Sequence, residues 1–465
     1  MVHFQYIYPR INNETIQLMI NIYNSEFTTR IEYILKFVIV EVLGESYEFY
    51  TDENQYLNSS GPKLNYSNKS IDPNEIRIFN SKFLSETGIR KFEPLVSKSK
   101  DFIKVFPDQE FNSSDESYID FDIFSSIFYF LTRYEEYFSF RKDKHGRFEA
   151  DQSFAFKHGF LEKPLVDIYI KYFKEKLASK FPELNFHKAT FKVQPTIDID
   201  QAFAIKEKSF FRWMFACLKA FASMRFRHLS KLITIKLGNA KDPFDVYDEF
   251  DRLHAKYNLK AVYFFLFSKN RTKYDINISR NNARFRKLIQ KLAVNSTIGI
   301  HPSYHSKSNM RVVEEELSAL SAVSFQLVDS SRQHFLKIRI PNAYRYLGSI
   351  GIQNEYTMGY ASRPGFRAST TLSYKFYDLE QEQISFLTIH PFSVMDATFK
   401  HYLNNTPSQA FESICRIIDE VKSVNGQFIP LWHNESLSNF AEWEGWQNVY
   451  EEMLAYCFMD NLIKN

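Results

Sequence analysis

The sequence has few cysteines, few glycines, little net charge and no long hydrophobic run. Its three cysteines, without close spacing, suit neither a disulfide framework nor a zinc-thiolate site and are typical of a reducing compartment. A net charge of +3 gives no electrostatic reason to expect a nucleic-acid partner. No apolar stretch reaches the ~18 residues needed to span a bilayer, and the N-terminus lacks a signal-peptide pattern. We therefore expect a cytoplasmic protein.

Hydrophobic and aromatic residues, in contrast, are abundant. Of the 465 residues, 44% are hydrophobic and 24% are charged, which excludes a disordered chain, and 47 are phenylalanine. The length suits two domains. A change in character near residue 190 predicts a smaller α/β domain of unknown role over 1–185 and a larger domain over 186–465.

Strand-like and helical patterns alternate through the larger domain. The expected strands span 191–200, 261–267, 296–300, 324–328, 384–389 and 426–432, and the expected helices span 281–293, 312–322 and 407–424. Such alternation predicts a parallel sheet, and its repetition predicts a closed or nearly closed (β/α) barrel. The predicted fold class is therefore α/β, with its chemistry at the carboxyl ends of the strands.

A basic insertion over residues 206–241 interrupts this alternation. It contains many lysines and arginines and a single acidic residue, Glu207. One interpretation is a basic amphipathic helix in peripheral contact with a membrane or an anionic polymer. The other is a helical excursion that packs its Phe, Trp and Leu side chains on the barrel and solvates its cations. The sequence leaves both interpretations open.

Two aspartates end the first strand of the larger domain. Because side chains alternate along a strand, Asp198 and Asp200 lie on the same side, within reach of one metal ion or one water. A pair of this kind also occurs as a helix cap or a turn former. The pair therefore indicates a functional site only in the company of further ligands.

Two histidines after the strand 296–300 are further candidate ligands. His301 and His305 are four residues apart, a spacing that places both imidazoles on one face of a helical turn, as a divalent metal requires. A buried core histidine is the alternative for either residue. With an aspartate from another strand end, the pair leaves coordination positions open, which is typical of a catalytic metal site.

A third histidine closes the last expected strand. His433 is a candidate general acid beside a metal site, because imidazole has a pKa of ~6.5 and donates a proton near neutral pH. Without such a site it would be a capping or packing residue. Smaller candidates, expected to be structural or to contact substrate, are Arg332, Arg367, His390 and Asp396.

In their order over residues 190–440, these motifs resemble the polysaccharide deacetylases with a NodB-type domain, carbohydrate esterase family four. The shared series is an Asp-containing strand, His-x-x-x-His, an Arg-bearing segment and a last strand ending in Leu-x-His. Residues 125–167, 332–336, 355–361 and 365–368 look like a Bacteroidetes branch in which an N-terminal α/β domain precedes the catalytic one. The resemblance implies a distorted (β/α) barrel of the NodB deacetylase type.

The resemblance also implies roles for single residues. Asp198 corresponds to the catalytic base and His433 to the general acid, and either Arg332 or Arg367 corresponds to the arginine that orients the base. The ligands of a divalent metal, expected to be zinc, correspond to Asp200, His301 and His305. Because the first motif reads Asp-Ile-Asp rather than adjacent aspartates, the assignment of base and ligand between its two carboxylates stays open.

The implied activity is removal of N-acetyl or O-acetyl groups from a carbohydrate, with metal-bound water attacking the acetyl carbonyl. The protein would then be a hydrolase acting on carbon–nitrogen bonds other than peptide bonds, with an acetylated carbohydrate as its partner. Two alternatives are a non-catalytic carbohydrate-binding or scaffold protein on the same fold and an amidohydrolase acting on a small molecule. Metal content and acetate release distinguish the three.

Overall fold

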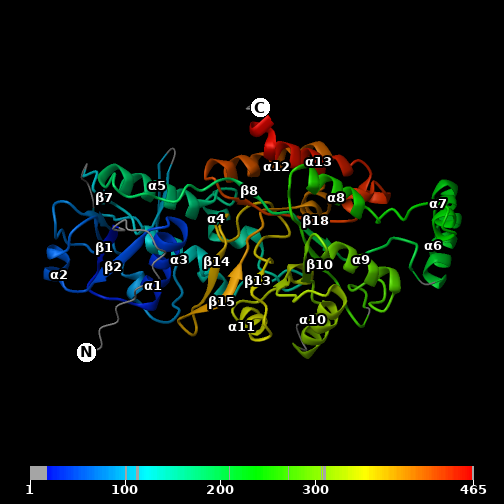
Figure 1. Cartoon of the computed structure of the whole chain (residues 1–465), viewed down its shortest axis with the longest axis horizontal. Coiled ribbons are helices and arrows are strands. Elements are labelled where there is room, and N and C mark those ends of the chain that lie inside the picture. The colour runs from blue at the N-terminus through cyan, green and yellow to red at the C-terminus, as the bar shows by residue number, and fades with distance from the viewer. Residues whose placement is uncertain are drawn as a thin grey trace. The chain divides into compact units, whose positions relative to one another are not determined.

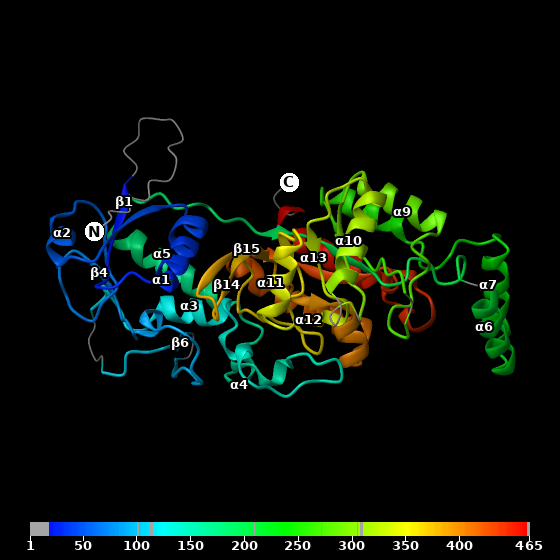
Figure 2. The same ribbon diagram turned by 90° about the horizontal axis from the view of Figure 1, so that it is seen from below.

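The computed structural model describes residues 18–99, 102–110, 115–208, 210–270, 272–304, 306 and 310–462, which form two compact α/β units (Figures 1 and 2). The first unit comprises Met1–Glu86, Pro94–Ser125 and Tyr172–His187, and the second comprises Thr87–Glu93, Ser126–Lys171 and Lys188–Asn465. We expected one boundary near residue 185. The residues beyond 188 do form one unit, and residues 126–171 belong to that unit as well.

The first unit is built on a parallel sheet with strand order β2-β1-β3-β4-β7. Its strand β1 buries Ile20 and Ile22, and the first helix buries Ile31 and Ile34. The strands are β1 (Met19–Tyr23), β2 (Ser46–Tyr50), β3 (Lys63–Asn65), β4 (Ile76–Ile78) and β7 (Tyr118–Ile119), with a separate antiparallel pair β5 (Val96–Lys98) and β6 (Ile103–Val105). The helices are α1 (Thr29–Leu35), continued by a π-helical stretch over Lys36–Val42, and α2 (Glu53–Asn58).

The second unit contains the larger sheet, with strand order β14-β15-β13-β12-β11-β10-β9-β18-β16. All neighbouring strands in it are parallel except β14 and β15. The strands are β9 (Thr196–Ile199), β10 (Val262–Phe265), β11 (Thr297–Ile300), β12 (Ser330–Ser331), β13 (Asn354–Glu355), β14 (Tyr374–Asp378), β15 (Gln383–Ile389), β16 (Val394–Met395) and β18 (Pro430–His433), and a small parallel pair consists of β8 (Lys192–Val193) and β17 (Gln427–Phe428).

Helices alternate with many of these strands, as the sequence patterns predicted, and further helices precede and follow the sheet in the chain. The helices of the second unit are α4 (Phe154–Lys157), α6 (Phe210–Ala222), α7 (Phe226–Lys236), α8 (Tyr247–Lys256), α9 (Ala283–Ala293), α10 (Met310–Ser324), α11 (Asn342–Ser349), α12 (Pro407–Ser423) and α13 (Gln447–Leu462), while α3 (Ile123–Leu131) and α5 (Leu165–Lys180) continue across the division between the units. Short 3₁₀ or π segments span Phe83–Ser85, Tyr134–Tyr137, Ala150–Gln152, His334–Leu336, Thr398–Tyr402, Ser436–Ser438 and Ala441–Trp443. None of the described helices is long and apolar enough to cross a membrane.

One predicted strand is wrong. The expected strand 324–328 is the end of α10 followed by irregular chain, and the strand in this region is β12 at Ser330–Ser331. Phe325 has a φ of 56°, in the left-handed region, and both Phe325 and Leu327 are exposed. Two of the three apolar side chains that suggested a buried strand therefore stay outside the core, whereas Val328 is buried.

The larger sheet is not confirmed as a continuous hydrogen-bonded barrel. Its ladders among the described strands end at β14 and β16. However, β15 and β16 belong to one chain segment, separated only by residues 390–393. The N–H of His390 donates to the carbonyl of Glu355 beside β13, and the N–H of Ser393 donates to the carbonyl of Ile429 beside β18. The two sides of the sheet are therefore joined through this segment.

Candidate metal and acid-base site

Four of the predicted site residues come from strands of the second unit, at or just after their carboxyl ends. Asp198 and Asp200 end β9, His433 ends β18, and His301 follows β11 directly. Asp198 and His433 are direct partners in the register of β9 and β18. Because parallel strands present their carboxyl ends at the same edge, residues far apart in the chain meet there.

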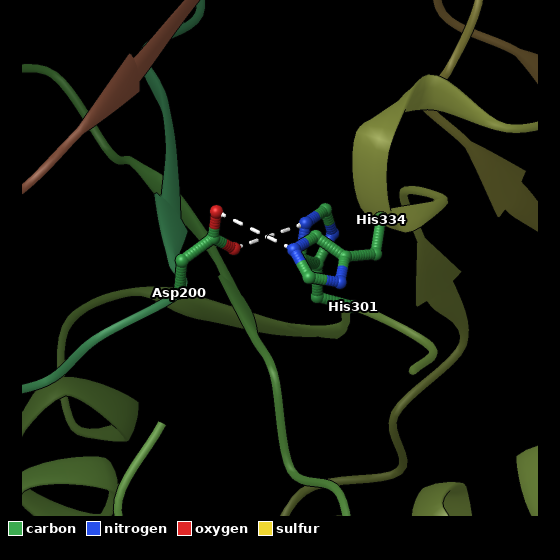
Figure 3. Close-up of side chains that lie close together, drawn as sticks. All are labelled: Asp200, His301 and His334. Atoms are coloured by element: carbon green, nitrogen blue, oxygen red, sulfur yellow. Dashed lines mark ion pairs between the residues drawn. The ribbon is translucent and has the colours of Figure 1, made fainter. Parts of the chain in front are cut away.

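Asp200, His301 and His334 form a cluster with the composition of a metal site. One ligand atom from each residue lies within 4.8 Å of the others. The Nε2 of His301 lies 3.3 Å from Oδ1 of Asp200, and the Nε2 of His334 lies 3.5 Å from Oδ2 (Figure 3). A tetrahedral ion with bonds of ~2.0–2.1 Å places its ligand atoms about 3.3–3.4 Å apart. The two observed separations are of this order, and they run to different oxygens of Asp200.

Hydrogen bonds orient both imidazoles toward the cluster. The Nδ1 of His301 lies 2.6 Å from the carbonyl oxygen of Arg332, and the Nδ1 of His334 lies 3.1 Å from Oδ1 of Asp275. A carbonyl or a carboxylate only accepts, so each Nδ1 carries a hydrogen, and each Nε2 is the nitrogen left to face the cluster. This arrangement of outer hydrogen bonds is the one found around metal-binding histidines.

The electrostatics of the cluster also favour a cation. The Oδ1 of Asp200 is buried and accepts no hydrogen bond. Burial opposes ionisation of Asp200, but the charges of His334 and His301 hold the pKa of its carboxyl well below the usual range. Burial likewise disfavours the imidazolium of His334, but Asp200 and Asp275 raise the pKa of His334 to about 9. A divalent ion satisfies the same carboxylate in place of these protons.

His334 was not predicted as a ligand, and His305, which was, lies outside the described residues. His334 has no motif spacing to His301, because it belongs to the short 3₁₀ segment after β12, whereas His301 follows β11. Only the adjacency of β11 and β12 brings the two imidazoles together, with ring centroids 4.9 Å apart. The one sequence signal for His334 was its position two residues after Arg332.

Arg332 holds Asp198 in place. It is fully buried, and its Nη1 donates to Oδ1 of Asp198 at 2.8 Å. Its Nη2 donates to Thr196 Oγ1 at 2.8 Å, and its Nε donates to the carbonyl of Tyr356 at 3.0 Å. The guanidinium also lies over the ring of Phe264, 4.6 Å from its centroid. Because Oδ1 is occupied, Oδ2 of Asp198 faces the cluster, 3.8 Å from Nε2 of His301.

Arg367, the rival candidate, lies in a different buried ion-pair cluster. Its Nε donates to Oε1 of Glu136 at 2.9 Å, and Arg133 donates to the same oxygen at 2.8 Å. The two guanidinium groups outweigh the effect of burial and lower the pKa of Glu136 to about 2. The structure therefore places Arg332, and not Arg367, against Asp198.

His433 is held by the carboxylate of Asp396. Its Nδ1 donates to Oδ1 of Asp396 at 2.7 Å, and its backbone N–H donates to Oδ2 at 2.8 Å. Its Nε2 points toward Asp200, 3.9 Å from Oδ2. Burial disfavours the imidazolium, but Asp396 raises the pKa of His433 to about 10.

His390, one of the smaller candidates, supports the site from outside. Its ring stacks on Tyr356, with centroids 4.4 Å apart, and its nitrogens pair with Asn354 and Ser373. Burial lowers the pKa of His390 to about 4, so the ring is neutral at physiological pH. Since the carbonyl of Tyr356 receives a hydrogen bond from Arg332, His390 packs behind the arginine rather than in the cluster.

Accessibility shows the side from which a ligand reaches the cluster. The side chains of Asp200 and His433 are 24% and 17% exposed, whereas those of Asp198, His301 and His334 are at most 4% exposed. The ring of Phe335 lies beside His334, and the rings of Tyr274 and the buried Tyr304 lie against Phe335. Asp200 and His433 are therefore the members of the site that solvent reaches most, and a group of aromatic rings lies nearby.

A comparison with protein families finds one match outside this site. A family of unknown function, DUF7033, matches residues 20–182, which is less than half of the chain. No curated protein matches the sequence.

Solved structures of proteins assigned to the deacetylase class are similar to this chain at a low level. A protein from Mycobacterium smegmatis assigned as a polysaccharide deacetylase is 14% identical, with a TM-score of 0.38, over 59% of this chain and 86% of that chain. The polysaccharide deacetylase of Bacillus cereus is 8% identical, with a TM-score of 0.29, over 59% and 89%. A CE4 family pseudoenzyme from Bacillus anthracis is 11% identical, with a TM-score of 0.31, over 59% and 63%.

Proposed function

We propose that the protein is a metal-dependent hydrolase that removes acetyl groups, N-linked or O-linked, from a carbohydrate. The observation that carries this proposal is that a carboxylate and an imidazole from neighbouring strands both reach one cluster. Asp198 reaches the cluster with Oδ2, and His433 reaches it with Nε2. Each is held through its other polar atom, by Arg332 and Asp396 respectively.

Asp200, His301 and His334 are the residues that would hold the metal. A divalent ion bound there supplies a Lewis acid that polarises the acetyl carbonyl and acidifies water. Zinc suits one carboxylate and two imidazoles, since this set leaves coordination positions open. The carboxylate of Asp275 and the carbonyl of Arg332 keep both imidazoles in the tautomer that presents Nε2.

The two flanking residues divide the proton transfers between them. Oδ2 of Asp198 accepts the proton of the attacking water as its oxygen bonds to the acetyl carbon. Nε2 of His433 donates a proton to the sugar nitrogen as the carbon–nitrogen bond breaks, so that acetate and a free amine leave. For an O-acetyl group, the same proton goes to the sugar oxygen. The strongly raised pKa of His433 suits a residue that must hold its proton until that step.

The surroundings support a carbohydrate substrate. Tyr274 and Phe335 are half-buried, and their rings belong to a group that includes Tyr304 and His145. Aromatic faces offer apolar surface on which a sugar ring packs. The buried Oδ1 of Asp200, which accepts no hydrogen bond, argues against a scaffold protein, because an unsatisfied buried polar atom is costly without a function.

Zinc content and acetate release from chitooligosaccharide test the proposal on the purified full chain. We expect Asp198→Asn to keep its zinc and to lose about 10²–10⁴-fold in rate. We expect His334→Ala to lose zinc and activity together. Its zinc affinity and its rate should each fall by more than the roughly 10–100-fold that follows from loss of an outer hydrogen-bond partner. His305→Ala, measured in parallel, shows whether the histidine implied by the resemblance also binds the ion.

The exposed His401 provides a matched control, and His401→Ala should keep both zinc and activity. Acetate release by Asp198→Asn at the parental rate would show that the base is misassigned. Zinc binding without hydrolysis of any acetylated sugar would favour a binding protein. Faster hydrolysis of small acetamides than of oligosaccharides would favour the amidohydrolase.

A further inference from the structure

The basic insertion forms a helical hairpin, α6 followed by α7. Both views show the two helices side by side and away from the other helices and strands of the second unit (Figures 1 and 2). The turn between them contains Met224, whose φ is 52°. The hairpin therefore has a base near the rest of the unit and a tip at residues 221–227.

The base of the hairpin is fixed to the loop that carries Asp200. The carboxylate of Asp242 accepts hydrogen bonds of 2.8 Å from the N–H groups of Ala204, Ile205 and Lys206. Lys208 donates to the side chain of Gln201 at 2.9 Å. These bonds tie both ends of the insertion to the chain that follows β9.

One face of the hairpin packs, but the second interpretation of the sequence is wrong for the phenylalanines, because Phe210, Phe211, Phe215, Phe221 and Phe226 are all exposed rather than packed on the barrel. Ala220, Leu232 and Ile235 are buried in a cluster with Ile205 and Phe244. The partly buried side chains on this cluster include Trp213, Ala216, Cys217 and Leu229. On α6 these positions recur at helical spacing, so one stripe of the helix fully accounts for the packing.

The opposite face of the hairpin is apolar and exposed. Met224 is 79% exposed and Phe215 is 73% exposed. The other large hydrophobic side chains exposed on the hairpin are Phe210, Phe211, Leu218, Phe221, Phe226, Ile233 and Leu237. Single exposed hydrophobic residues are ordinary on a protein surface, but a group of this size on one element marks an interaction surface.

The charges on the hairpin are of one sign. Lys219, Arg225, Arg227 and Lys231 are exposed, and the chain contains no aspartate or glutamate between Lys208 and Lys241. Two of these cations, Arg225 and Arg227, alternate with exposed hydrophobic side chains at the tip. A surface of this kind pairs with a partner that is both apolar and anionic.

We propose that the α6–α7 hairpin docks on the surface of an anionic phospholipid bilayer. Its phenylalanines, leucines and Met224 enter the boundary between headgroups and acyl chains, and its cations contact the anionic headgroups. A second copy of the chain is a poorer partner, because it brings the same four exposed cations against their equivalents. An anionic polymer is also a poorer partner, because it contacts the cations but leaves the exposed aromatic side chains in water.

Sedimentation with vesicles tests this proposal on the full chain. We expect binding to vesicles of equal parts phosphatidylcholine and phosphatidylglycerol, and weak binding to phosphatidylcholine alone. Arg225→Gln with Arg227→Gln should weaken the binding about 5-fold for each cation removed. Phe215→Ser with Met224→Ser and Phe226→Ser should weaken it about tenfold or more for each side chain. Acetate release from a soluble oligosaccharide should stay at the parental level in both variants.

Matched controls lie elsewhere on the second unit. Arg286→Gln with Lys287→Gln removes two exposed cations of α9, and Phe386→Ser removes an exposed ring of β15; both should bind vesicles like the parent. The proposal is overturned if the parent does not sediment with anionic vesicles, or if the hairpin variants sediment as well as the parent. It is also overturned if the parent is a dimer and the hairpin substitutions make it a monomer. A third contrary result is that the parent binds a soluble polyanion that vesicles do not displace, and that the hairpin substitutions abolish this binding.

Discussion

At the scale of single residues, the site depends on which atom of each side chain is already occupied. Arg332 takes one oxygen of Asp198, and Asp396 takes Nδ1 of His433. The remaining atom of each residue then faces the cluster. Each of these two orientations is fixed by a charged hydrogen bond inside a buried site, where such bonds are strong.

Replacing Asp396 with asparagine removes the charge that raises the pKa of His433. In the metal-free chain, we expect the imidazole of His433 to titrate near 10 in the parent and at lower pH in Asp396→Asn. A general acid acts only while it is protonated, so activity falls as the pH rises through its pKa. The alkaline limb of the pH–rate profile of the zinc-loaded enzyme should therefore move to lower pH in the variant.

Imidazole NMR resonances and the pH dependence of acetate release measure the two effects separately. Asp419→Asn, which changes an exposed aspartate, should leave both curves in place. If the titration of His433 were the same in the parent and in Asp396→Asn, Asp396 would not be its partner in solution.

At the scale of elements, neighbouring strands fit together through one glycine behind the site. Gly299 of β11 is paired in register with Phe264 of β10. A Cβ at position 299 would lie 2.5 Å from the ring of Phe264. The guanidinium of Arg332 also lies over this ring. The absence of a side chain at Gly299 therefore allows the ring to lie where it supports the guanidinium.

Gly299→Ala should disturb the site without changing any polar residue. We expect the ring of Phe264 to shift, the free energy of unfolding to fall by about 1–3 kcal/mol, and acetate release to fall more than zinc content. Denaturant unfolding, zinc analysis and rate measurement on one preparation give the three quantities. Gly348→Ala is the control, since a Cβ there meets no atom within 4 Å in α11 and should stabilise the chain by roughly 0.5–1 kcal/mol. Equal behaviour of the two variants would contradict this account.

At the scale of the whole molecule, the second unit is assembled from segments that are distant in the chain. Glu136 pairs with Arg367, and the carboxylate of Asp167 accepts a hydrogen bond from the hydroxyl of Thr370 at 2.6 Å. Residues 126–171 thus supply the buried carboxylates that pair with polar groups of the chain after residue 188. A fragment that begins near 186 would leave the guanidinium of Arg367 buried without its carboxylate.

Glu136→Gln should destabilise the second unit in a pH-dependent way. Glu136 has a pKa of 4.5 when unfolded and about 2 when folded, so its stabilisation is present above about pH 4.5 and is lost as the pH falls toward 2. We expect the variant to lose about 3–5 kcal/mol near neutral pH, and the gap to the parent to shrink at low pH.

Tryptophan fluorescence during denaturant unfolding is the measurement, because Trp213, Trp432, Trp443 and Trp446 all belong to the second unit. Glu412→Gln changes an exposed glutamate of α12 and should leave the stability unchanged at every pH. A gap between parent and Glu136→Gln that stays constant down to about pH 2.5 would exclude the ion-pair explanation.

Much of the larger fold was predictable because it depends on local patterns. The alternation of strands and helices after residue 190 is present in the structure, with helices such as α9 and α12 within two residues of their expected bounds. The strand expected at 324–328 failed because two of its three apolar side chains, Phe325 and Leu327, are exposed, which a window of sequence does not reveal. The site roles assigned to single residues stay predictions for the experiments above.

The sequence by itself determined the α/β class and the positions of Asp198, Asp200, His301 and His433 at strand ends, because periodicity and strand termination are local properties. Only the tertiary structure decided which residues meet. It brought His334 to Asp200, placed Arg332 rather than Arg367 on Asp198, and joined Asp396 to His433. The physical reason is that parallel strands place distant segments at one sheet edge, and no spacing along the chain records which side chains then come within hydrogen-bond distance.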